Sequence, residues 1–416
     1  MWSCGKPSGP MLQYQAMKYV LIVPDGMADW SLPELDGRTP LMAARTPALD
    51  ALARESLIGT VLTVPQGMYP GSDVANMALL GYDPRQYYTG RGPLEAAAMG
   101  IPLDPRDVAF RCSLISTDGE TLLDHSGGGI STDEARPLIE WLQTKLGTPQ
   151  IHFFAGVGYR HVMRWQNGPV EVHCTPPHEI VGQPLRTHYP RGDGEQTLRQ
   201  LIEDSFELLD THPINRRRRE EGKLPANMAW FWGQGRAPRL EPFSLKWGIT
   251  GAVIAAVDLI KGLGILAGLE VPQVPGATGY VDTNYHAKGE YTLRMLQKHN
   301  FAYTHIEAPD EAGHHGDIEA KIWAIEQIDR HIIEQVVEGL RTQNQPFRLM
   351  MVPDHFTPIA KRTHAEGAVP FLLYDSQQPH PNRLPYDESV LEQPGIPFIE
   401  EGYRLIEWLL VKEGGA

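Results

Sequence analysis

Apolar residues along the chain form short runs rich in β-branched side chains, and these runs alternate with stretches of helical periodicity. The clearest runs cover residues 19–23, 59–64, 347–352 and 368–374. A continuous apolar run of this length is typical of a strand buried on both faces, as in a parallel sheet. Over residues 317–340, isoleucine and valine recur at helical spacing, which predicts an amphipathic packing helix. The alternation predicts an α/β fold.

The pattern changes near residue 104 and returns near residue 246. The segment between has a glycine-rich turn at 127–129, a helical stretch at 133–146 and a charge run at 216–221 that we expect to be a solvated helix end. We therefore expect a core of residues 17–104 and 246–416 with a smaller α/β domain inserted at 105–245. Residues 1–16 lack the pattern of a signal peptide and are expected to be a disordered extension.

Composition narrows the class of protein. The 416 residues are 42% hydrophobic and 21% charged, as in a soluble globular protein. A net charge of −14 argues against general nucleic-acid binding and against a basic membrane-binding patch. No apolar run has the length of a membrane span. The three cysteines are widely spaced and form no disulfide framework, which favours a reduced, cytoplasmic setting.

Carboxylates and imidazoles gather in the last third of the chain. Asp310 and His314 lie four positions apart, Asp354 and His355 end an apolar run, and His364 follows. Carboxylate oxygens mixed with imidazole nitrogens suit Zn²⁺, Mn²⁺ or a similar divalent ion. Each pair alone could be a solvated surface pair, but three such groups in succession favour a metal site.

Two further candidates stand near the N-terminus. Asp25 directly follows the strand predicted at 19–23, and ligands gather at that end of strands in open α/β sheets. The alternative is a plain Asp-Gly turn. Ser72 follows a glycine at a predicted helix start, where free backbone N–H groups favour an anion and the ionised hydroxyl. The alternative is an ordinary helix cap.

Cationic candidates for holding an anion lie in and after the inserted segment. Arg160, Arg236 and Arg239 occupy glycine-rich turns beside aromatic residues, where a guanidinium can fork onto a phosphate or carboxylate. A surface turn is the alternative for each. Lys261 could bind substrate, or it could be an ordinary lysine near a helix end before Gly262.

The order of these residues resembles that of the alkaline phosphatase superfamily. More closely, the chain from Met17 onward resembles the cofactor-independent phosphoglycerate mutases of the archaeal-type branch. The stretches that carry the resemblance are 24–29, 71–76, 90–93, 275–279, 310–316 and 353–355. The resemblance implies an alkaline phosphatase-like three-layer core with a mainly parallel sheet, plus the inserted smaller α/β domain.

The resemblance also implies two divalent ions, Mn²⁺, Zn²⁺ or similar, and no 2,3-bisphosphoglycerate. One ion would be held by Asp25, Ser72, Asp354 and His355, and the other by Asp310, His314 and His364. Asp282 and His286 repeat the Asp-x-x-x-His spacing but match no ligand position of the family.

By the same resemblance, the small phosphorylated substrate would be 3-phosphoglycerate, converted to 2-phosphoglycerate through a phosphoserine at Ser72. Arg160, Arg236, Arg239 and Lys261 would hold the glycerate while the inserted domain closes over it. The alternatives are a phosphatase, a homoserine kinase-like paralogue acting on another alcohol, and a non-catalytic binding protein. The chain could also form a homo-oligomer.

Overall fold

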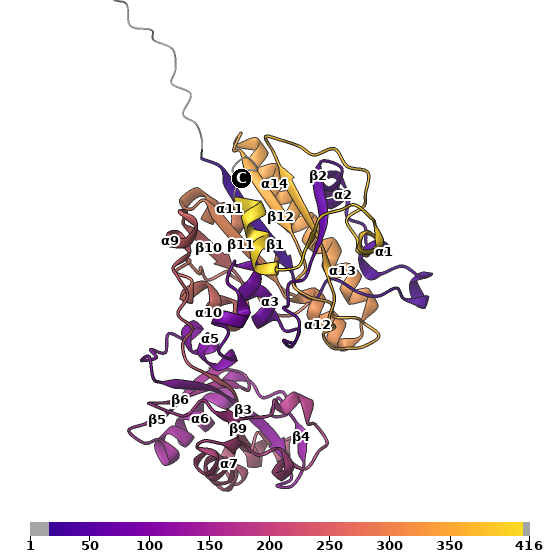
Figure 1. Cartoon of the computed structure of the whole chain (residues 1–416). Helices are drawn as coiled ribbons and strands as arrows, with labels where there is room; N and C mark the ends of the chain where they lie inside the picture. The colour runs from indigo at the N-terminus through magenta and orange to yellow at the C-terminus, as the bar shows by residue number, and fades with distance from the viewer. Residues whose placement is uncertain (1–15, 411–416) are drawn as a thin grey trace, which may run out of the picture.

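The computed structural model describes residues 16–410, so the expectation for residues 1–16 lies outside it except for Ala16. A seven-stranded sheet forms the upper body in Figure 1. Its strands, in spatial order, are β10 (Gly251–Ile254), β11 (Phe301–Ile306), β1 (Lys18–Pro24), β12 (Phe347–Met351), β13 (Val369–Asp375), β2 (Ser56–Val61) and β14 (Phe398–Ile399). The pairs from β10 to β12 are parallel, as is β2 with β14, whereas β13 runs antiparallel to both neighbours. The expected mainly parallel α/β sheet is confirmed.

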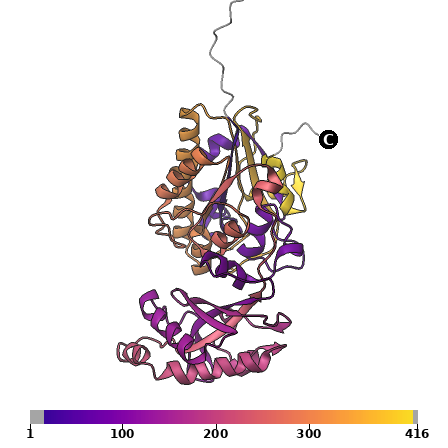
Figure 2. The ribbon, with the colours of Figure 1, turned by 90° about the vertical axis from the view of Figure 1, so that its left-hand side faces the viewer.

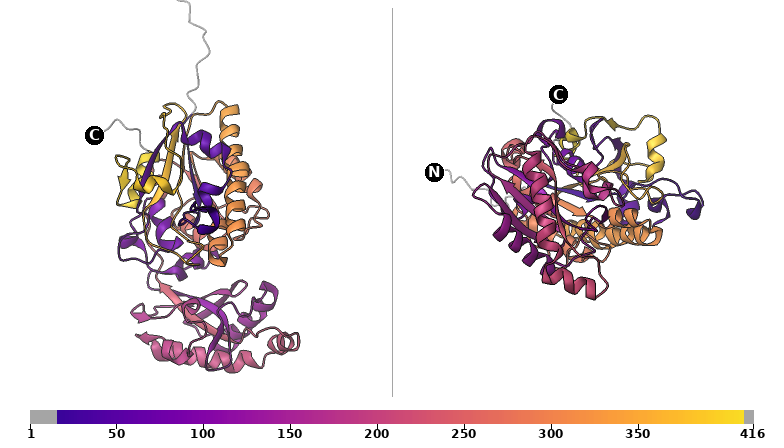
Figure 3. Two further views of the ribbon diagram at one scale, coloured as in Figure 1. Left: turned by 90° about the vertical axis from the view of Figure 1, so that its right-hand side faces the viewer. Right: turned by 90° about the horizontal axis from the view of Figure 1, so that it is seen from below.

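Helices cover both faces of this sheet, which gives three layers (Figures 2 and 3). Along β1, Val20 and Ile22 pack into one apolar cluster, and Leu21 and Val23 into the other, because successive strand residues point to opposite faces. The first face carries α1 (Pro40–Ala43), α2 (Pro47–Ala53), α11 (Tyr285–Lys298), α13 (Ile318–Ile328) and α14 (Glu334–Thr342). The second carries α3 (Ser72–Leu79), α9 (Phe243–Trp247), α10 (Asp258–Leu266) and α15 (Leu405–Leu410).

The helix expected over 317–340 is interrupted. A π-helical turn, Asp329–Ile333, joins α13 to α14. The Asp329 carboxylate is buried there and accepts hydrogen bonds from the backbone N–H groups of Ala48 and Leu49 at the start of α2. A polar side chain inside an apolar pattern thus fixes α2 against this helix.

A second, antiparallel sheet lies below the first in Figure 1. Its strands are β3 (Val108–Thr117), β4 (Leu122–Asp124), β5 (Ile151–Val157), β6 (Arg160–Trp165) and β9 (Met228–Gly235). Its helices are α6 (Thr132–Leu146), α7 (Glu195–Asp210) and α8 (Pro213–Glu220), and a ribbon of β7 (Val172–His173) and β8 (Arg191–Gly192) completes it. These elements share one apolar cluster. All of them fall within the segment expected to be inserted, although limits at 105 and 245 stay a prediction.

The charge run at 216–221 was expected to be solvated, and for Arg218 this was wrong. Its side chain is 1% exposed and pairs with Glu134 at 2.8 Å. Its guanidinium also donates to the carbonyl oxygens of Gly127, Gly128 and Leu224. A buried guanidinium is stable only when its donors are satisfied, and these carbonyl groups satisfy them. Arg218 therefore holds the glycine-rich turn at 127–129 in place.

Helix α5 (Arg91–Ala98) leads from the core to the second sheet and packs closely on α10. The short α4 (Pro84–Tyr87) precedes it. A Cβ atom on Gly262 of α10 would collide with the carbonyl oxygen of Leu94 and lie 2.7 Å from its carbonyl carbon. Among the described residues, no helix has the length and apolar character needed to cross a membrane.

We predict that Gly262→Ala lowers the free energy of unfolding by about 1–3 kcal/mol, because the backbone of α5 cannot yield to the added methyl group. The better helix propensity of alanine, about 1 kcal/mol, does not offset this clash. Gly279→Ala is the matched control, since a Cβ there meets Val257 at 3.5 Å and Glu307 at 3.8 Å, which are ordinary contacts. Urea unfolding of both variants measures the effect. Equal stability of the two variants would contradict the prediction.

Candidate active site

Three neighbouring parallel strands end at the same edge of the central sheet, and each delivers a polar residue there. Asp25 follows β1, His305 lies near the end of β11, and Asp354 and His355 come after β12. The start of α3 brings Ser72 to this edge, and α12 (Ala308–His315) brings Asp310 and His314. This is the edge at which open α/β sheets bind ligands.

Asp25 is completely buried. Its Oδ2 lies 3.0 Å from Nε2 of His305 and its Oδ1 lies 3.5 Å from Nε2 of His355, yet neither oxygen has a hydrogen bond of good geometry. Burial, followed by the nearby carboxylates of Asp354, Glu307 and Asp310, raises the pKa of Asp25 well above its usual value. A buried carboxylate left without a donor is a position that a cation would stabilise.

Asp354 and Ser72 complete the first group of donor atoms. The Oδ1 of Asp354 accepts from the backbone N–H groups of Gly26 and His355, both at 2.9 Å, and its Oδ2 accepts from Nδ2 of Asn76 at 2.8 Å. Ser72 is 8% exposed, and its Oγ lies 3.2 Å from Nε2 of His355. Four predicted ligands, contributed by three separate elements, therefore face one point.

Asp310, His314 and His364 form the second group. Nε2 of His314 lies 3.2 Å from Oδ2 of Asp310, and Nε2 of His364 lies 3.5 Å from Oδ1 of the same residue. The two Nε2 atoms are 3.1 Å apart. Burial opposes ionisation of Asp310, but its hydrogen bonds with His314 and His364 hold its pKa well below the usual range. Burial lowers the pKa of His314, but its hydrogen bond with Asp310 and the Asp310 charge outweigh this and raise the pKa to about 9.

The two groups are adjacent. Asp25, Asp310 and His355 offer donor atoms within 4.8 Å of one another, and so do Asp310, His314 and His364. The structure thus brings together all seven residues predicted from the sequence as ligands. Carboxylates, imidazoles and a hydroxyl suit Mn²⁺ or Zn²⁺. Their role as ligands stays a prediction.

His305 was missed from the sequence. It is fully buried at the end of β11, and it forms a third set of close donor atoms with Asp25 and Asp354. Its carbonyl oxygen accepts from Nζ of the buried Lys288 at 2.9 Å. The residue stands inside an apolar strand pattern, so only the alignment of β11 beside β1 distinguishes it from a core histidine.

The predicted cations lie in different surroundings. Arg160 begins β6 with its guanidinium 5.1 Å from the ring centroid of Tyr159. Burial raises the pKa of Glu307 to about 7. The positive charge of Arg160 is among the influences that oppose this rise, so Arg160 lies within electrostatic range of the carboxylates at the sheet edge. Lys261 on α10 lies 3.3 Å from Asp258. Burial lowers the pKa of Lys288 to about 8, and Lys261 contributes to this shift.

Arg236 and Arg239 are exposed on the segment after β9. Within residues 16–410, neither side chain forms a hydrogen bond or ion pair with the residues at the sheet edge. The role of these two arginines in holding substrate stays a prediction.

A cluster of cationic and aromatic side chains on and beside the second sheet was also missed. The guanidinium of Arg111 is buried 4.4 Å from the ring centroid of Trp232 and pairs with Glu95 at 3.0 Å. The His178 ring lies 5.4 Å from the same tryptophan. Burial, followed by the charges of Arg91, Arg111, His125 and His364, lowers the pKa of His178 to about 3. The charge of His364 is the smallest of these influences, so the cluster lies within electrostatic range of the second group of predicted ligands.

Arg91 connects this cluster to Ser72. Its guanidinium lies 5.9 Å from the ring centroid of Trp232, and its Nε donates to Oδ2 of Asp73 at 2.9 Å. Tyr88 donates to the same oxygen. Asp73 directly follows Ser72, so this pairing holds a positive charge beside the serine.

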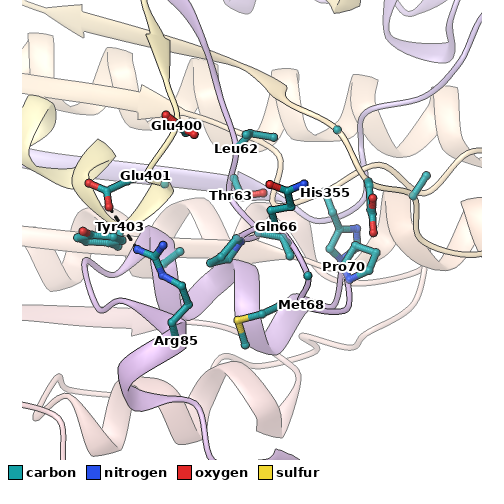
Figure 4. Close-up of a pocket in the computed structure, with 18 residues that line it drawn as sticks. Leu62, Thr63, Gln66, Met68, Pro70, Arg85, His355, Glu400, Glu401 and Tyr403 are labelled. Atoms are coloured by element: carbon teal, nitrogen blue, oxygen red, sulfur yellow. Dashed lines mark hydrogen bonds and ion pairs between the residues drawn. The ribbon is translucent and has the colours of Figure 1, made fainter.

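A cavity of about 690 Å³ has His355 in its wall (Figure 4). The rest of its lining includes residues 62–68, Pro70, Ala365–Gly367 and residues 400–403. Glu366, Glu400 and Glu401 line it, and Arg85 is paired with Glu401 at 3.2 Å. This negative lining does not suit a phosphorylated substrate, whereas the side facing Arg91, Arg111 and Arg160 does.

Comparison with known proteins agrees with this arrangement. A family model described as 2,3-bisphosphoglycerate-independent phosphoglycerate mutase matches residues 53–215. A mutase of that name from Methanosarcina mazei is 46% identical over 92% of this chain and 97% of its own length. Another, from Methanothermobacter thermautotrophicus, is 48% identical over 95% of this chain and 97% of its own length. The chain belongs to this family.

Solved structures support the same assignment of the fold. A protein from Pyrococcus horikoshii superposes with a TM-score of 0.81 and 26% identity, over 96% of this chain and all of that one. The cofactor-independent phosphoglycerate mutase of Thermoplasma acidophilum gives 0.62 and 26%, over 94% of this chain and 99% of that one. The family expected from the motifs is thus confirmed.

We predict that loading the metal-free protein with Mn²⁺ at pH 7 releases protons, because His314, whose pKa is raised to about 9, holds a proton that a cation must displace. As the pH rises from 7 to 9, His314 loses its proton beforehand. Fewer protons are then released and the apparent affinity increases. Calorimetry in two buffers with different ionisation enthalpies counts the protons. Heats that do not depend on the buffer would contradict the prediction.

We predict that His364→Ala removes one metal ion of two, because Asp310 and His314 alone leave one group of donors incomplete. Metal analysis of the purified, Mn²⁺-loaded protein gives the stoichiometry. His286→Ala is the matched control, since His286 belongs to the other Asp-x-x-x-His pair and is exposed. Unchanged stoichiometry in His364→Ala would refute the ligand assignment.

Proposed function

We propose that this protein is a metal-dependent, 2,3-bisphosphoglycerate-independent phosphoglycerate mutase that interconverts 3-phosphoglycerate and 2-phosphoglycerate through a phosphoserine at Ser72. One observation carries the proposal. The Ser72 hydroxyl lies 3.2 Å from His355 at the meeting point of two groups of metal-type donors, with arginines on its open side. The mutase names of the relatives agree with it.

In this proposal, one ion is held by Asp25, Ser72, Asp354 and His355, and the other by Asp310, His314 and His364. When bound, the ions supply the charge that lowers the pKa of the serine hydroxyl and neutralises phosphoryl oxygens. The unpartnered oxygens of Asp25 and the facing Nε2 atoms of His314 and His364 support this assignment.

Ser72 is suited to the role of nucleophile. It is the first residue of the eight-residue helix α3, where the helix dipole favours negative charge on the hydroxyl oxygen. Its Oγ would attack the phosphorus of 3-phosphoglycerate, and the bond from phosphorus to the C3 oxygen would break. The proton lost by Ser72 ends on that oxygen. The C2 hydroxyl then attacks the phosphoserine, and its proton returns to Ser72.

Holding the glycerate between the two transfers requires fixed positive charge. We assign the phosphoryl oxygens to Arg91, which its pairing with Asp73 keeps beside Ser72. We assign the glycerate carboxylate to the face formed by Arg111, Arg160 and His178, with Lys261 at the rim. Arg236 and Arg239 would reach the substrate only after the second sheet moves toward the first, as in enzymes that close over their substrates.

The cellular location of the protein is also a proposal. Cys112 is buried and Cys174 is partly buried, and both are free thiols. Free thiols are usual in reduced compartments, so we propose a cytoplasmic location.

The test is an assay of the chelator-stripped, Mn²⁺-reloaded protein with 3-phosphoglycerate and no bisphosphoglycerate, in which both 2-phosphoglycerate and free phosphate are followed. We expect metal-dependent 2-phosphoglycerate with little phosphate. Phosphate alone would replace the proposal with a phosphatase. If neither product forms, another acceptor alcohol is indicated, with homoserine tested first.

We predict that Ser72→Ala abolishes this activity and leaves the fold intact, because the hydroxyl contributes at most about 1 kcal/mol to the helix start. Ser131→Ala is the matched control. Ser131 caps α6 in the second sheet's domain by accepting from the backbone N–H of Glu134 at 3.3 Å. Circular dichroism and thermal unfolding check both folds. Mutase activity above a trace in Ser72→Ala would exclude Ser72 as the nucleophile.

A further inference from the structure

Thr357 lies between the two groups of predicted ligands. Its Oγ1 donates to Oδ1 of Asp310 at 2.5 Å and lies 3.2 Å from Nδ1 of His355. Asp310 belongs to one group and His355 to the other, so one hydroxyl touches both. The residue is completely buried.

The Thr357 hydroxyl has a single proton, and this determines which hydrogen bond it can donate. A threonine hydroxyl has one proton to give, and an ionised carboxylate has none. The hydroxyl proton is therefore directed at Asp310. The contact with His355 must then use the ring N–H as the donor and the hydroxyl oxygen as the acceptor.

The proton of the neutral His355 ring consequently sits on Nδ1. This leaves the lone pair on Nε2, which faces Oγ of Ser72 at 3.2 Å and Oδ1 of Asp25 at 3.5 Å. A neutral imidazole binds a metal through its unprotonated nitrogen while the other ring N–H donates to a neighbour. Thr357 thus presents the nitrogen that the proposed site needs.

The surroundings fix Thr357 on three sides. Gly26 has φ +58°, and a Cβ there would lie 2.5 Å from Oγ1 of Thr357 and 2.6 Å from Oδ1 of Asp310. A Cβ on Gly313 would lie 2.8 Å from the Thr357 methyl carbon. The carbonyl oxygen of Thr357 accepts from Nζ of Lys321 at 2.8 Å, and the same Nζ donates to Asp29 at 2.7 Å. Two glycines and a buried ion pair therefore leave the hydroxyl little freedom.

We propose that Thr357 is a positioning residue that sets the tautomer of His355 and the orientation of Asp310, and so couples the two metal sites. It acts through these two side chains and does not touch substrate. The inference rests on the proposed metal sites. The alternative is that Thr357 only fills space in the core, in which case its methyl group contributes to packing and its hydroxyl has no effect on His355 or Asp310.

The two ideas are separated by three variants. Thr357→Val keeps the shape and removes the hydroxyl, whereas Thr357→Ser keeps the hydroxyl and removes the methyl group. Thr117→Val is the matched control, because Thr117 is also buried and its hydroxyl donates at 2.7 Å to the Thr121 carbonyl oxygen in the second sheet. Thermal unfolding establishes that each variant is folded.

The first readout is the ¹⁵N NMR spectrum of histidine-labelled, metal-free protein, with His355 assigned by comparison with His355→Gln. We expect the Nδ1–H tautomer in the wild type, Thr357→Ser and Thr117→Val, and the Nε2–H tautomer or a mixture in Thr357→Val. The second readout is calorimetric titration with Mn²⁺. We expect Thr357→Val to bind about 10–100-fold more weakly and Thr357→Ser to stay near the wild type.

An Nε2–H tautomer in the wild-type protein overturns the proposal even if Thr357→Val fails to fold. So does wild-type tautomer and affinity in a folded Thr357→Val. Because the spectrum needs neither substrate nor metal, a protein that lacks mutase activity but shows the Nδ1–H tautomer would refute the proposed function without refuting the role of Thr357.

Discussion

Three carboxylates, those of Asp25, Asp310 and Asp354, are buried together where the central strands end, and the partly exposed carboxylate of Glu307 lies beside them. Burying unpaired charge costs several kcal/mol per group, so such a cluster persists only with protons, donors or cations around it. The protein uses each of these. Backbone and amide N–H groups satisfy Asp354, imidazoles lower the pKa of Asp310, and burial raises the pKa of Asp25 and Glu307, which favours their protonated forms. Bound divalent ions would replace those protons. Because β11, β1 and β12 run parallel, the carboxylates that follow them meet at the same edge of the sheet.

The division of the chain into two sheets separates two tasks. Most side chains of the two groups of predicted ligands follow strand ends or stand on the short helices α3 and α12 beside the larger sheet, and His364 lies in a loop. The arginines that suit an anion stand on or beside the smaller one. The two chain segments that join the sheets run close together, because a Cβ on Gly90 or Gly92 would collide with the carbonyl oxygen of Gln234 or Ala109. If the second sheet moves as proposed, Arg91 stays beside Ser72 through its pairing with Asp73, and only the arginines of the second sheet change their distance from the predicted ligands.

The strands and site residues that could be predicted from the sequence are those that leave a pattern among neighbouring residues. Buried strands show as apolar runs, so β1, β2, β12 and β13 could be placed within a few residues. Asp25 and Asp354 were found because they end such runs. His305, by contrast, sits inside one, and only the pairing of β11 with β1 brings it to Asp25. Arg218 looked solvated because its partners, the carbonyl groups of a turn about ninety positions away, leave no trace in the sequence.

The cationic residues show the same limit of sequence-based prediction, because their contacts depend on residues distant in the sequence. Arg160 was found because it stands in a turn beside an aromatic residue, whereas Arg111 lies within β3 and reads as one polar position in a strand. What gives Arg111 its place is Trp232 on the adjacent strand β9, a contact set by strand pairing. The pairing of strands distant in the sequence therefore determines where these arginines lie relative to the predicted ligands, and residue spacing alone does not.

The acidic cavity beside His355 bears on how a mutase avoids hydrolysis. Ser72 and His355 are 8% and 2% exposed, so the reacting edge is nearly closed, but the cavity gives water a path toward it. Dryness alone would then not protect a phosphoserine. A hydroxyl held in attack geometry has an effective molarity of roughly 10⁵–10⁸ M, far above the concentration of water. If the arginine face retains the glycerate as proposed, transfer to its second hydroxyl would outrun hydrolysis. On this reasoning, the difference between a mutase and a phosphatase built on such a sheet lies in the side chains of the second sheet and not in the metal-type residues.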